Sequence, residues 1–224
     1  MSFLFQFSGL EYGTRTLLNV FTDPYDGTYT WTQTGTTITV NSGVSGKIAW
    51  ITSNGSGSGV YRRVVRDLGE NLNDAIWTID WEVVQSLLTT PNYFPVTITS
   101  AATGIQESDS DVIGTNLAAT DKAVILYGET VAGLAVSAGT ITAGTLSTTY
   151  YYRLVRESAT LVKLFIYSDA ARTTEIAGSP ISQTIASTIT GLRYIHHEIH
   201  ESVTVQSVSA NGDNLTVYDG VAKA

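Results

Sequence analysis

The three histidines of the chain, His196, His197 and His200, lie in one short run that also contains Glu198. Imidazole nitrogens bind transition metals and take up a proton at about pH 6.5. In a β-strand His196, Glu198 and His200 would share a face, but same-face neighbours lie about 6.5 Å apart, too far for all three to close on one ion. We therefore predict a solvated or interfacial strand face that loses stability in acid, with a metal site built from two of these side chains as the alternative.

A second group with metal-binding chemistry is acidic. Glu107, Asp109 and Asp111 lie close together in a polar segment, Thr103 to Thr120, which we predict to be a long loop. Carboxylates are among the hard oxygen ligands that Ca²⁺ prefers, but their spacing here does not match an EF-hand loop. We expect a solvated acidic loop, with calcium binding as the alternative, and no other cofactor.

Aromatic side chains are the third chemical group. Tryptophan and tyrosine rings can stack on the apolar face of a sugar, although most such residues in a β-sandwich belong to the core. The candidates for a sugar-binding surface are Trp31, Trp50, Tyr93 and Tyr127.

Two further features are candidates for assembly contacts. The segment Val60 to Asp67 holds a local concentration of arginine, and the N-terminal residues form an apolar arm. The arginines could meet an acidic partner subunit or form ordinary cross-strand ion pairs, and the arm could dock on its own domain or on a neighbouring subunit. The assembly candidates are Phe3, Phe5, Phe7, Arg62, Arg63 and Arg66.

The elements that must position these side chains are β-strands, because apolar and polar residues alternate with a period of two. The clearest example is Tyr150 to Asp169, which predicts a hairpin with one buried face. In the run Trp77 to Val84, four residues with apolar side chains recur at every second position and should face the core. These four residues are Trp77, Ile79, Trp81 and Val83.

Other short alternating runs bring the total to about a dozen strands at the spacing typical of a sandwich or barrel. We predict an all-β fold, an antiparallel β-sandwich formed by one domain over residues 20–219. Residues 1–19 form the N-terminal arm and residues 220–224 a tail. With 43% hydrophobic residues, the chain has enough apolar side chains for a core of this size.

Composition excludes several classes of function. A net charge of -8 without a Lys/Arg tract argues against nucleic-acid binding, which needs a basic surface. The chain has no cysteine, so disulfides and thiol chemistry are absent. The N-terminal apolar run is short and lacks a basic region, so we expect no signal peptide, no membrane span, and synthesis in the cytoplasm.

Three stretches carry a resemblance to a known family: Phe21 to Val40, the run WTIDWE from Trp77, and Tyr151 to Tyr194. Over residues 20–219 the chain resembles the concanavalin A-like lectin and glucanase jelly rolls, especially the laminin-G-like domains of phage and metagenomic virion proteins. The resemblance implies a jelly-roll sandwich. Its motifs are strand and turn signatures rather than catalytic ones.

The strand Thr78 to Glu82 looks like the paired-carboxylate strand of the laminarinase-like glycoside hydrolases on this fold, with Thr78 where that family carries its nucleophilic glutamate. Retaining hydrolysis needs a carboxylate nucleophile, and a threonine cannot replace it. We therefore expect no enzymatic activity. Asp80 and Glu82 should lie on a polar outer strand face or on a degenerate binding face.

These observations give an ordered set of functional expectations. The first is a non-enzymatic structural or adhesion protein of a virion, such as a capsid decoration, tail or fibre component, made in the host cytoplasm and acting as a homo-oligomer with other virion proteins. The first alternative is a lectin-like carbohydrate-binding module that recognises a surface glycan. The second alternative is a degenerate laminarinase-like glycoside hydrolase.

Overall fold

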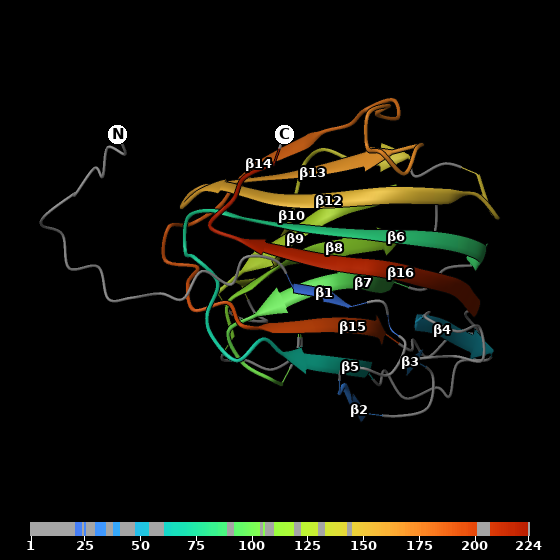
Figure 1. The fold of residues 1–224 in the computed structure, drawn as a ribbon, viewed down its shortest axis with the longest axis horizontal. Coiled ribbons are helices and arrows are strands. Elements are labelled where there is room, and N and C mark those ends of the chain that lie inside the picture. The colour runs from blue at the N-terminus through green and yellow to red at the C-terminus, as the bar shows by residue number, and fades with distance from the viewer. Residues whose placement is uncertain are drawn as a thin grey trace, which may run out of the picture.

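The computed structural model describes residues 21–23, 25, 30–34, 38–40, 48–53, 61–88, 92–103, 105, 110–118, 122–129, 133–142, 145–200 and 207–223. Within these residues the regular structure is β-strand, arranged in two sheets (Figure 1). The described part of the chain contains no helix that is long and apolar enough to cross a membrane.

Sheet A has β12 and β6 near its centre and short strands at its edges. Its spatial order is β14 (Ile181–Thr184), β13 (Leu161–Tyr167), β12 (Thr149–Ser158), β6 (Trp77–Leu88), β16 (Ser207–Asp219), β4 (Ile48–Ser53) and β3 (Ile38–Val40), and β1 (Phe21–Asp23) pairs with β16.

Sheet B has β7 and β15 near its centre. Its order is β10 (Ala135–Val136), β9 (Lys122–Gly128), β8 (Val112–Ala118), β7 (Asn92–Thr99), β15 (Tyr194–His200), β5 (Tyr61–Asp67) and β2 (Thr32–Thr34), and β11 (Ile141–Thr142) pairs with β9. The strand pairings of both sheets are antiparallel.

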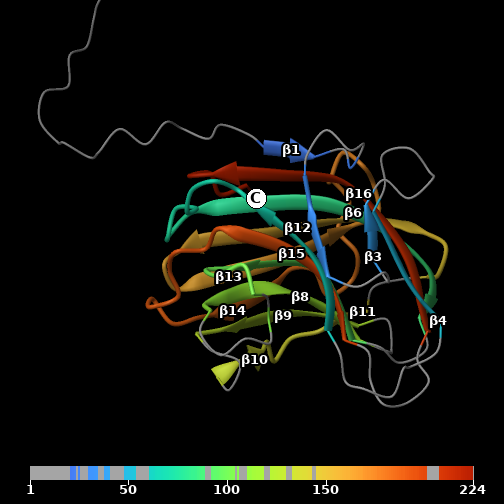
Figure 2. The ribbon, with the colours of Figure 1, turned by 90° about the horizontal axis from the view of Figure 1, so that it is seen from below.

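The two sheets stack as layers, with β6 and β16 in one and β8 and β9 in the other (Figure 2). This arrangement confirms the predicted all-β antiparallel sandwich. The predicted hairpin is also present, formed by β12 and β13.

The core between the layers follows the predicted alternation. Trp77, Ile79, Trp81 and Val83 of β6 are buried in the main hydrophobic cluster. The Trp81 ring stacks on the ring of Tyr152, its neighbour on β12, with centroids 5.3 Å apart. Because side chains in a strand alternate between faces, the residues between these four point away from the core.

The prediction of a long loop from Thr103 to Thr120 is wrong in its second half, where β8 pairs with β7 and β9. Val112, Ile113 and Leu117 of this strand are buried. The Gly114-Thr115-Asn116 run interrupts the apolar pattern and hid the strand. Gly114 allows the close approach of β7, because a Cβ there would lie 2.8 Å from Thr97 Cα.

Candidate functional site

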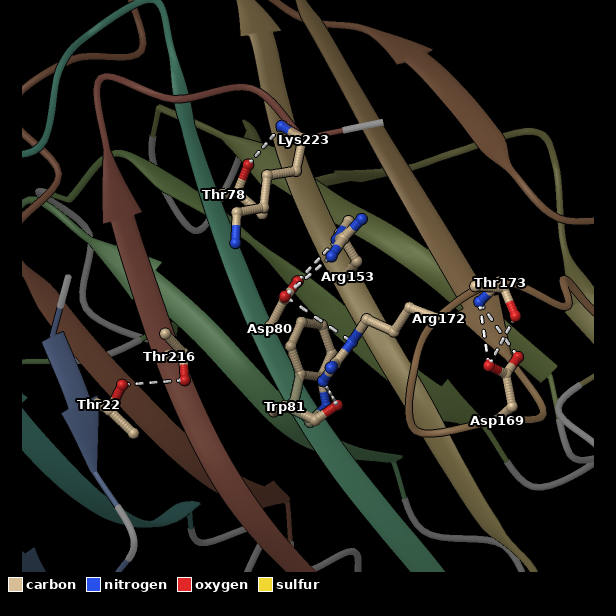
Figure 3. A network of polar contacts seen from close by, with 10 residues as sticks. All are labelled: Thr22, Thr78, Asp80, Trp81, Arg153, Asp169, Arg172, Thr173, Thr216 and Lys223. Atoms are coloured by element: carbon tan, nitrogen blue, oxygen red, sulfur yellow. Dashed lines mark hydrogen bonds and ion pairs between the residues drawn. The ribbon is translucent and has the colours of Figure 1, made fainter. Parts of the chain in front are cut away.

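The outer face of sheet A carries a buried group of charges. Asp80 of β6 lies opposite Arg153 of β12 in the strand ladder. Arg153 donates from Nε to Asp80 Oδ1 at 2.9 Å and from Nη2 to Oδ2 at 3.1 Å, a two-pronged contact that holds both groups in one plane. The Nε atom of Arg172 lies 3.8 Å from Oδ2 on the other side (Figure 3). The Asp80 side chain is 5% exposed, so this outer strand face is polar, as predicted, but covered.

The loop after β13, residues 168–175, brings Arg172 onto this face. The Asp169 carboxylate closes the loop by accepting hydrogen bonds from the N–H groups of Thr173 and Thr174. Arg172 itself has φ of 55°, a left-handed conformation that few non-glycine residues adopt. Its guanidinium lies 5.8 Å from the centre of the Tyr151 ring. The loop therefore covers the centre of the outer face with a cation stacked on an aromatic ring.

The C-terminal segment covers one end of the same face. The chain reverses at Gly220, which has φ of 69°. The Thr78 hydroxyl donates to Val221 O at 2.8 Å and accepts from the Lys223 N–H at 3.0 Å. Thr78 is fully buried as a result.

Glu82 is the remaining acidic residue of this strand. It is partly exposed, and its Oε1 accepts a hydrogen bond from Asn214 Nδ2 at 3.0 Å. Thus Thr78 is bound by the C-terminal segment, both oxygens of Asp80 are bound by Arg153, and Glu82 is held by an amide.

The prediction of a solvated or interfacial face at the histidines is wrong. His196, His197 and Glu198 of β15 are fully buried. The ring of His197 points into the core, where its Nε2 contacts the Tyr25 hydroxyl at 2.9 Å and its Nδ1 contacts the carbonyl of Pro95. Since a carbonyl can only accept, Nδ1 carries the proton and Nε2 accepts from Tyr25. Burial lowers the pKa of His197 to about 4.

His196 and Glu198 point to the outer face of sheet B, where the segment after β7 covers them. Thr99 Oγ1 donates to Ala101 O at 2.6 Å and lies 2.8 Å from His196 Nε2, and the Ile105 N–H donates to Glu198 Oε1 at 3.1 Å. His196 Nδ1 lies 3.4 Å from Glu198 Oε1. Burial lowers the pKa of His196 to about 3 and raises that of Glu198 to about 7. Within the described residues, no three His, Asp or Glu side chains are placed to hold a metal ion, and the His200 side chain is outside them.

Of the acidic candidates, Glu107 and Asp109 lie outside the described residues. Asp111 precedes β8, and its Oδ2 accepts a hydrogen bond from the Thr190 N–H at 2.6 Å. Its carboxylate thus holds the loop of residues 185–191 at one end of the sandwich.

That loop forms one wall of a pocket, which we call the rim pocket. Its volume is about 240 Å³, and it is lined by Tyr127, Gly128, Glu129, Gly133, Ala186 and Ile189. The wall is held from several sides: Ile185 N–H donates to Thr160 O, Gly191 N–H to Asp74 Oδ1, and Arg156 Nη2 to Ile189 O at 2.8 Å. The pocket therefore has a fixed apolar wall, an aromatic ring and a carboxylate.

The aromatic candidates come from segments of both sheets. Tyr127 lines the rim pocket. Trp31 is partly buried, donates its Nε1–H to Asp23 Oδ2 at 2.8 Å, and packs on the His197 ring with centroids 4.7 Å apart. Trp50 lies on β4 and Tyr93 on β7, with side chains outside the described part.

The assembly candidates are described only in part. Phe3, Phe5, Phe7 and the Arg62 side chain lie outside the described residues. Arg63 lies opposite Glu198 in the β5–β15 ladder, and Arg66 donates to Thr30 O at 3.3 Å.

Sequence reasoning missed Arg153, Arg172, Arg156 and Glu129. A signal existed for Arg153, because it is one of the cations that interrupt the apolar pattern of the predicted hairpin, as Asp80 interrupts the pattern of its own strand. Nothing in the sequence placed Arg172 or Glu129, since both lie in loops or at a strand end.

Comparison with known proteins identifies the fold and no family. No protein-family model matches the chain, and no curated protein sequence matches it. Among solved structures, it resembles a GH43 protein from Bacillus licheniformis (TM-score 0.58, 8% identity, 88% of this chain and 39% of that one). It also resembles the receptor binding domain of a mosaic botulinum neurotoxin of serotype C/D (TM-score 0.53, 12% identity, 87% and 43%).

A third similar structure is a protein of unknown function from Shewanella oneidensis (TM-score 0.52, 14% identity, 87% of this chain and 77% of that one). The chain spans about two fifths of the first two proteins. At these identities the likeness shows a shared β-sandwich fold.

Proposed function

We propose that this chain is a non-enzymatic adhesion module that binds glycan in the rim pocket. The observation that carries the proposal is the combination of the Tyr127 ring and the Glu129 carboxylate in a pocket with a fixed wall. An aromatic ring offers a stacking surface for the apolar face of a sugar, and a carboxylate accepts hydrogen bonds from its hydroxyls. A few polar groups on a preformed apolar cavity are typical of small-ligand sites.

The outer face of sheet A supports a role without catalysis. Hydrolysis of a glycoside needs two available carboxyl groups flanking the bond. Asp80 is bound by two guanidinium groups, and the position of the nucleophile holds a threonine whose hydroxyl is bound by the C-terminal segment. The likeness to a receptor binding domain is compatible with a binding role.

The test is glycan binding by the wild-type protein and by Tyr127→Ala. We expect soluble oligosaccharides selected on a glycan array to bind the wild type, and Tyr127→Ala to weaken binding roughly tenfold, the size of a lost aromatic contact. Tyr194→Ala is the matched control, because Tyr194 is also partly buried but lies beside Arg193 on β15, which is separated from β9 by β8 and β7 in sheet B. An array without binders, or equal losses in both variants, would refute the proposal.

The site of action is proposed to be a virion, where an adhesion module is presented in several copies. The resemblance to virion jelly rolls supports this setting, and several weak sites on an oligomer would act together. Detection of the protein in purified particles, and an oligomer in light scattering, are the expected results. A monomer absent from particles would leave the glycan-binding proposal standing and remove the virion one.

A further inference from the structure

Among the described side chains near the rim pocket, negative charges outnumber positive ones. Three carboxylates surround the loop of residues 185–191, and each accepts a hydrogen bond from it: Asp74 from the Gly191 N–H, Asp111 from the Thr190 N–H, and Glu129 from the Thr188 hydroxyl. None of the three forms an ion pair with another described residue. Burial raises the pKa of Asp111, and the negative charges of Glu129 and Asp74 also raise it, whereas the hydrogen bond from the Thr190 N–H and the charge of Arg156 lower it.

One cation lies behind the pocket wall. Arg156 is fully buried, and its guanidinium donates to the carbonyls of Ser158, Ala159 and Ile189 rather than to a carboxylate. Among these four described groups, adding the single positive charge to the three negative charges leaves a net charge of about -2. A ligand that brings a positive charge would offset part of this surplus.

The arrangement favours an organic cation over a metal ion. A metal site needs several ligands that converge on one point. The three carboxylates come from different segments, before β6, before β8 and after β9, and no convergent group of three acidic or imidazole side chains exists in the described part of the chain. An ammonium group needs only one close carboxylate, and it also gains from a nearby aromatic ring such as Tyr127.

We propose that the rim pocket selects glycans that carry a free amino group, with the ammonium against Glu129 and the sugar ring against Tyr127. This inference rests on the proposed glycan-binding function of the same pocket. It assigns Glu129 the recognition of the cation and Tyr127 the stacking contact. Asp74 and Asp111 act at longer range, through the field that they maintain around the pocket.

The experiment compares two probes of equal length, a tetrasaccharide of glucosamine and the same tetrasaccharide with every amine acetylated. Acetylation removes the charge and keeps the ring. With calorimetric titration in mildly acidic buffer, we expect the free-amine probe to bind about tenfold more tightly at low salt, and the preference to shrink at high salt because the contact is electrostatic.

Two variants that each remove one negative charge test whether the preference for the free-amine probe arises at Glu129. Glu129→Gln should reduce the preference for the amine to less than about twofold, since the close carboxylate is gone. Glu82→Gln is the matched control, because Glu82 is also a carboxylate outside the core with one hydrogen bond but lies on sheet A. It should leave the preference unchanged. Unchanged melting temperatures would show that both variants are folded.

The outcomes separate this inference from the function on which it rests. Equal binding of both probes, abolished by Tyr127→Ala, would overturn the amine preference and leave glycan binding in the pocket intact. Binding of neither probe, together with an empty glycan array, would overturn both. An amine preference that falls equally in Glu129→Gln and Glu82→Gln would also overturn the inference, because it would reflect attraction to an acidic protein as a whole.

Discussion

Acidification from about pH 7 to about pH 5 should destabilise the fold through the buried side chains of β15. The imidazoles of His196 and His197 have pKa values of about 3 and about 4 in the folded protein, against an ordinary value of 6.5. The unfolded chain therefore takes up their protons as the pH falls through 6.5, whereas the folded chain does not. Stability from these two groups is lost as the pH falls below that value.

Glu198 acts in the opposite direction. Burial raises its pKa from 4.5 to about 7, so the folded protein holds a proton that the unfolded chain releases above pH 4.5. Its contribution to stability is complete below pH 4.5 and is lost as the pH rises through about 7. Arg63 lies opposite Glu198 on β5, and its positive charge lowers the pKa of both His196 and Glu198. For Glu198 this opposes the rise in pKa that burial causes.

The two contributions combine into a measurable slope. Near about pH 5 His196 and His197 hold nearly two protons in the unfolded chain, and Glu198 holds about one proton in the folded chain. For these three residues unfolding therefore takes up about one proton. The free energy of unfolding should then rise by about 1.4 kcal/mol per pH unit and level off near about pH 7. Asp67 and Asp169 have lowered pKa values and titrate below this range, whereas Asp111 has a raised pKa and acts in the same direction as Glu198.

The assay is urea unfolding, followed by tryptophan fluorescence, across this pH range. In Glu198→Gln the folded state loses its extra proton, and the slope should double to about 2.8 kcal/mol per pH unit. The amide can still accept from the Ile105 N–H, so the local structure is kept. Glu82→Gln should leave the slope unchanged. A flat profile in the wild type, or equal slopes in the wild type and Glu198→Gln, would refute the reasoning.

Three further predictions concern stability and are checked by the same denaturation assay. Asp80→Asn should lower the free energy of unfolding by about 3 kcal/mol, because it removes the counter-charge of two largely buried guanidinium groups. Asp67→Asn, which affects an exposed pair with Arg193, should change the free energy of unfolding little. Similar losses in both variants would contradict this prediction. Gly114→Ala should lower the free energy of unfolding by about 1 to 3 kcal/mol, since the added Cβ would lie 2.8 Å from Thr97 Cα. An unchanged free energy of unfolding would show that β7 and β8 can separate. Tyr25→Phe should lower the free energy of unfolding by about 1 kcal/mol, because it removes the hydroxyl that donates to His197 Nε2. A more stable variant would argue against that hydrogen bond.

The fold could be predicted well because strand periodicity is a local property. Trp77, Ile79, Trp81 and Val83 alternate so regularly that their common face had to be buried, and the structure places all four in the core. Periodicity failed at β8, where Gly114 and two polar residues interrupt the pattern. The strand forms there because its neighbours on both sides supply backbone partners.

The candidate site could be predicted only in part. Tyr127 was among the aromatic candidates, and the structure places it in a pocket with Glu129. The two come together there with Ala186 and Ile189, which lie far away in sequence. No spacing rule links a strand end to a distant loop, so the pocket could not be found from the sequence.

For strands with clear periodicity, such as β6, the amino-acid pattern is enough to show which side chains share a face, because successive residues of a strand point in opposite directions. Tertiary structure decided what lies above the outward-facing residues. Asp80 and Thr78 are covered by the loop of residues 168–175 and by the C-terminal segment, and His196 and Glu198 by the segment after β7. Whether an outward-facing polar side chain contacts water or protein depends on where distant segments pack. That position is set by the packing of the whole chain.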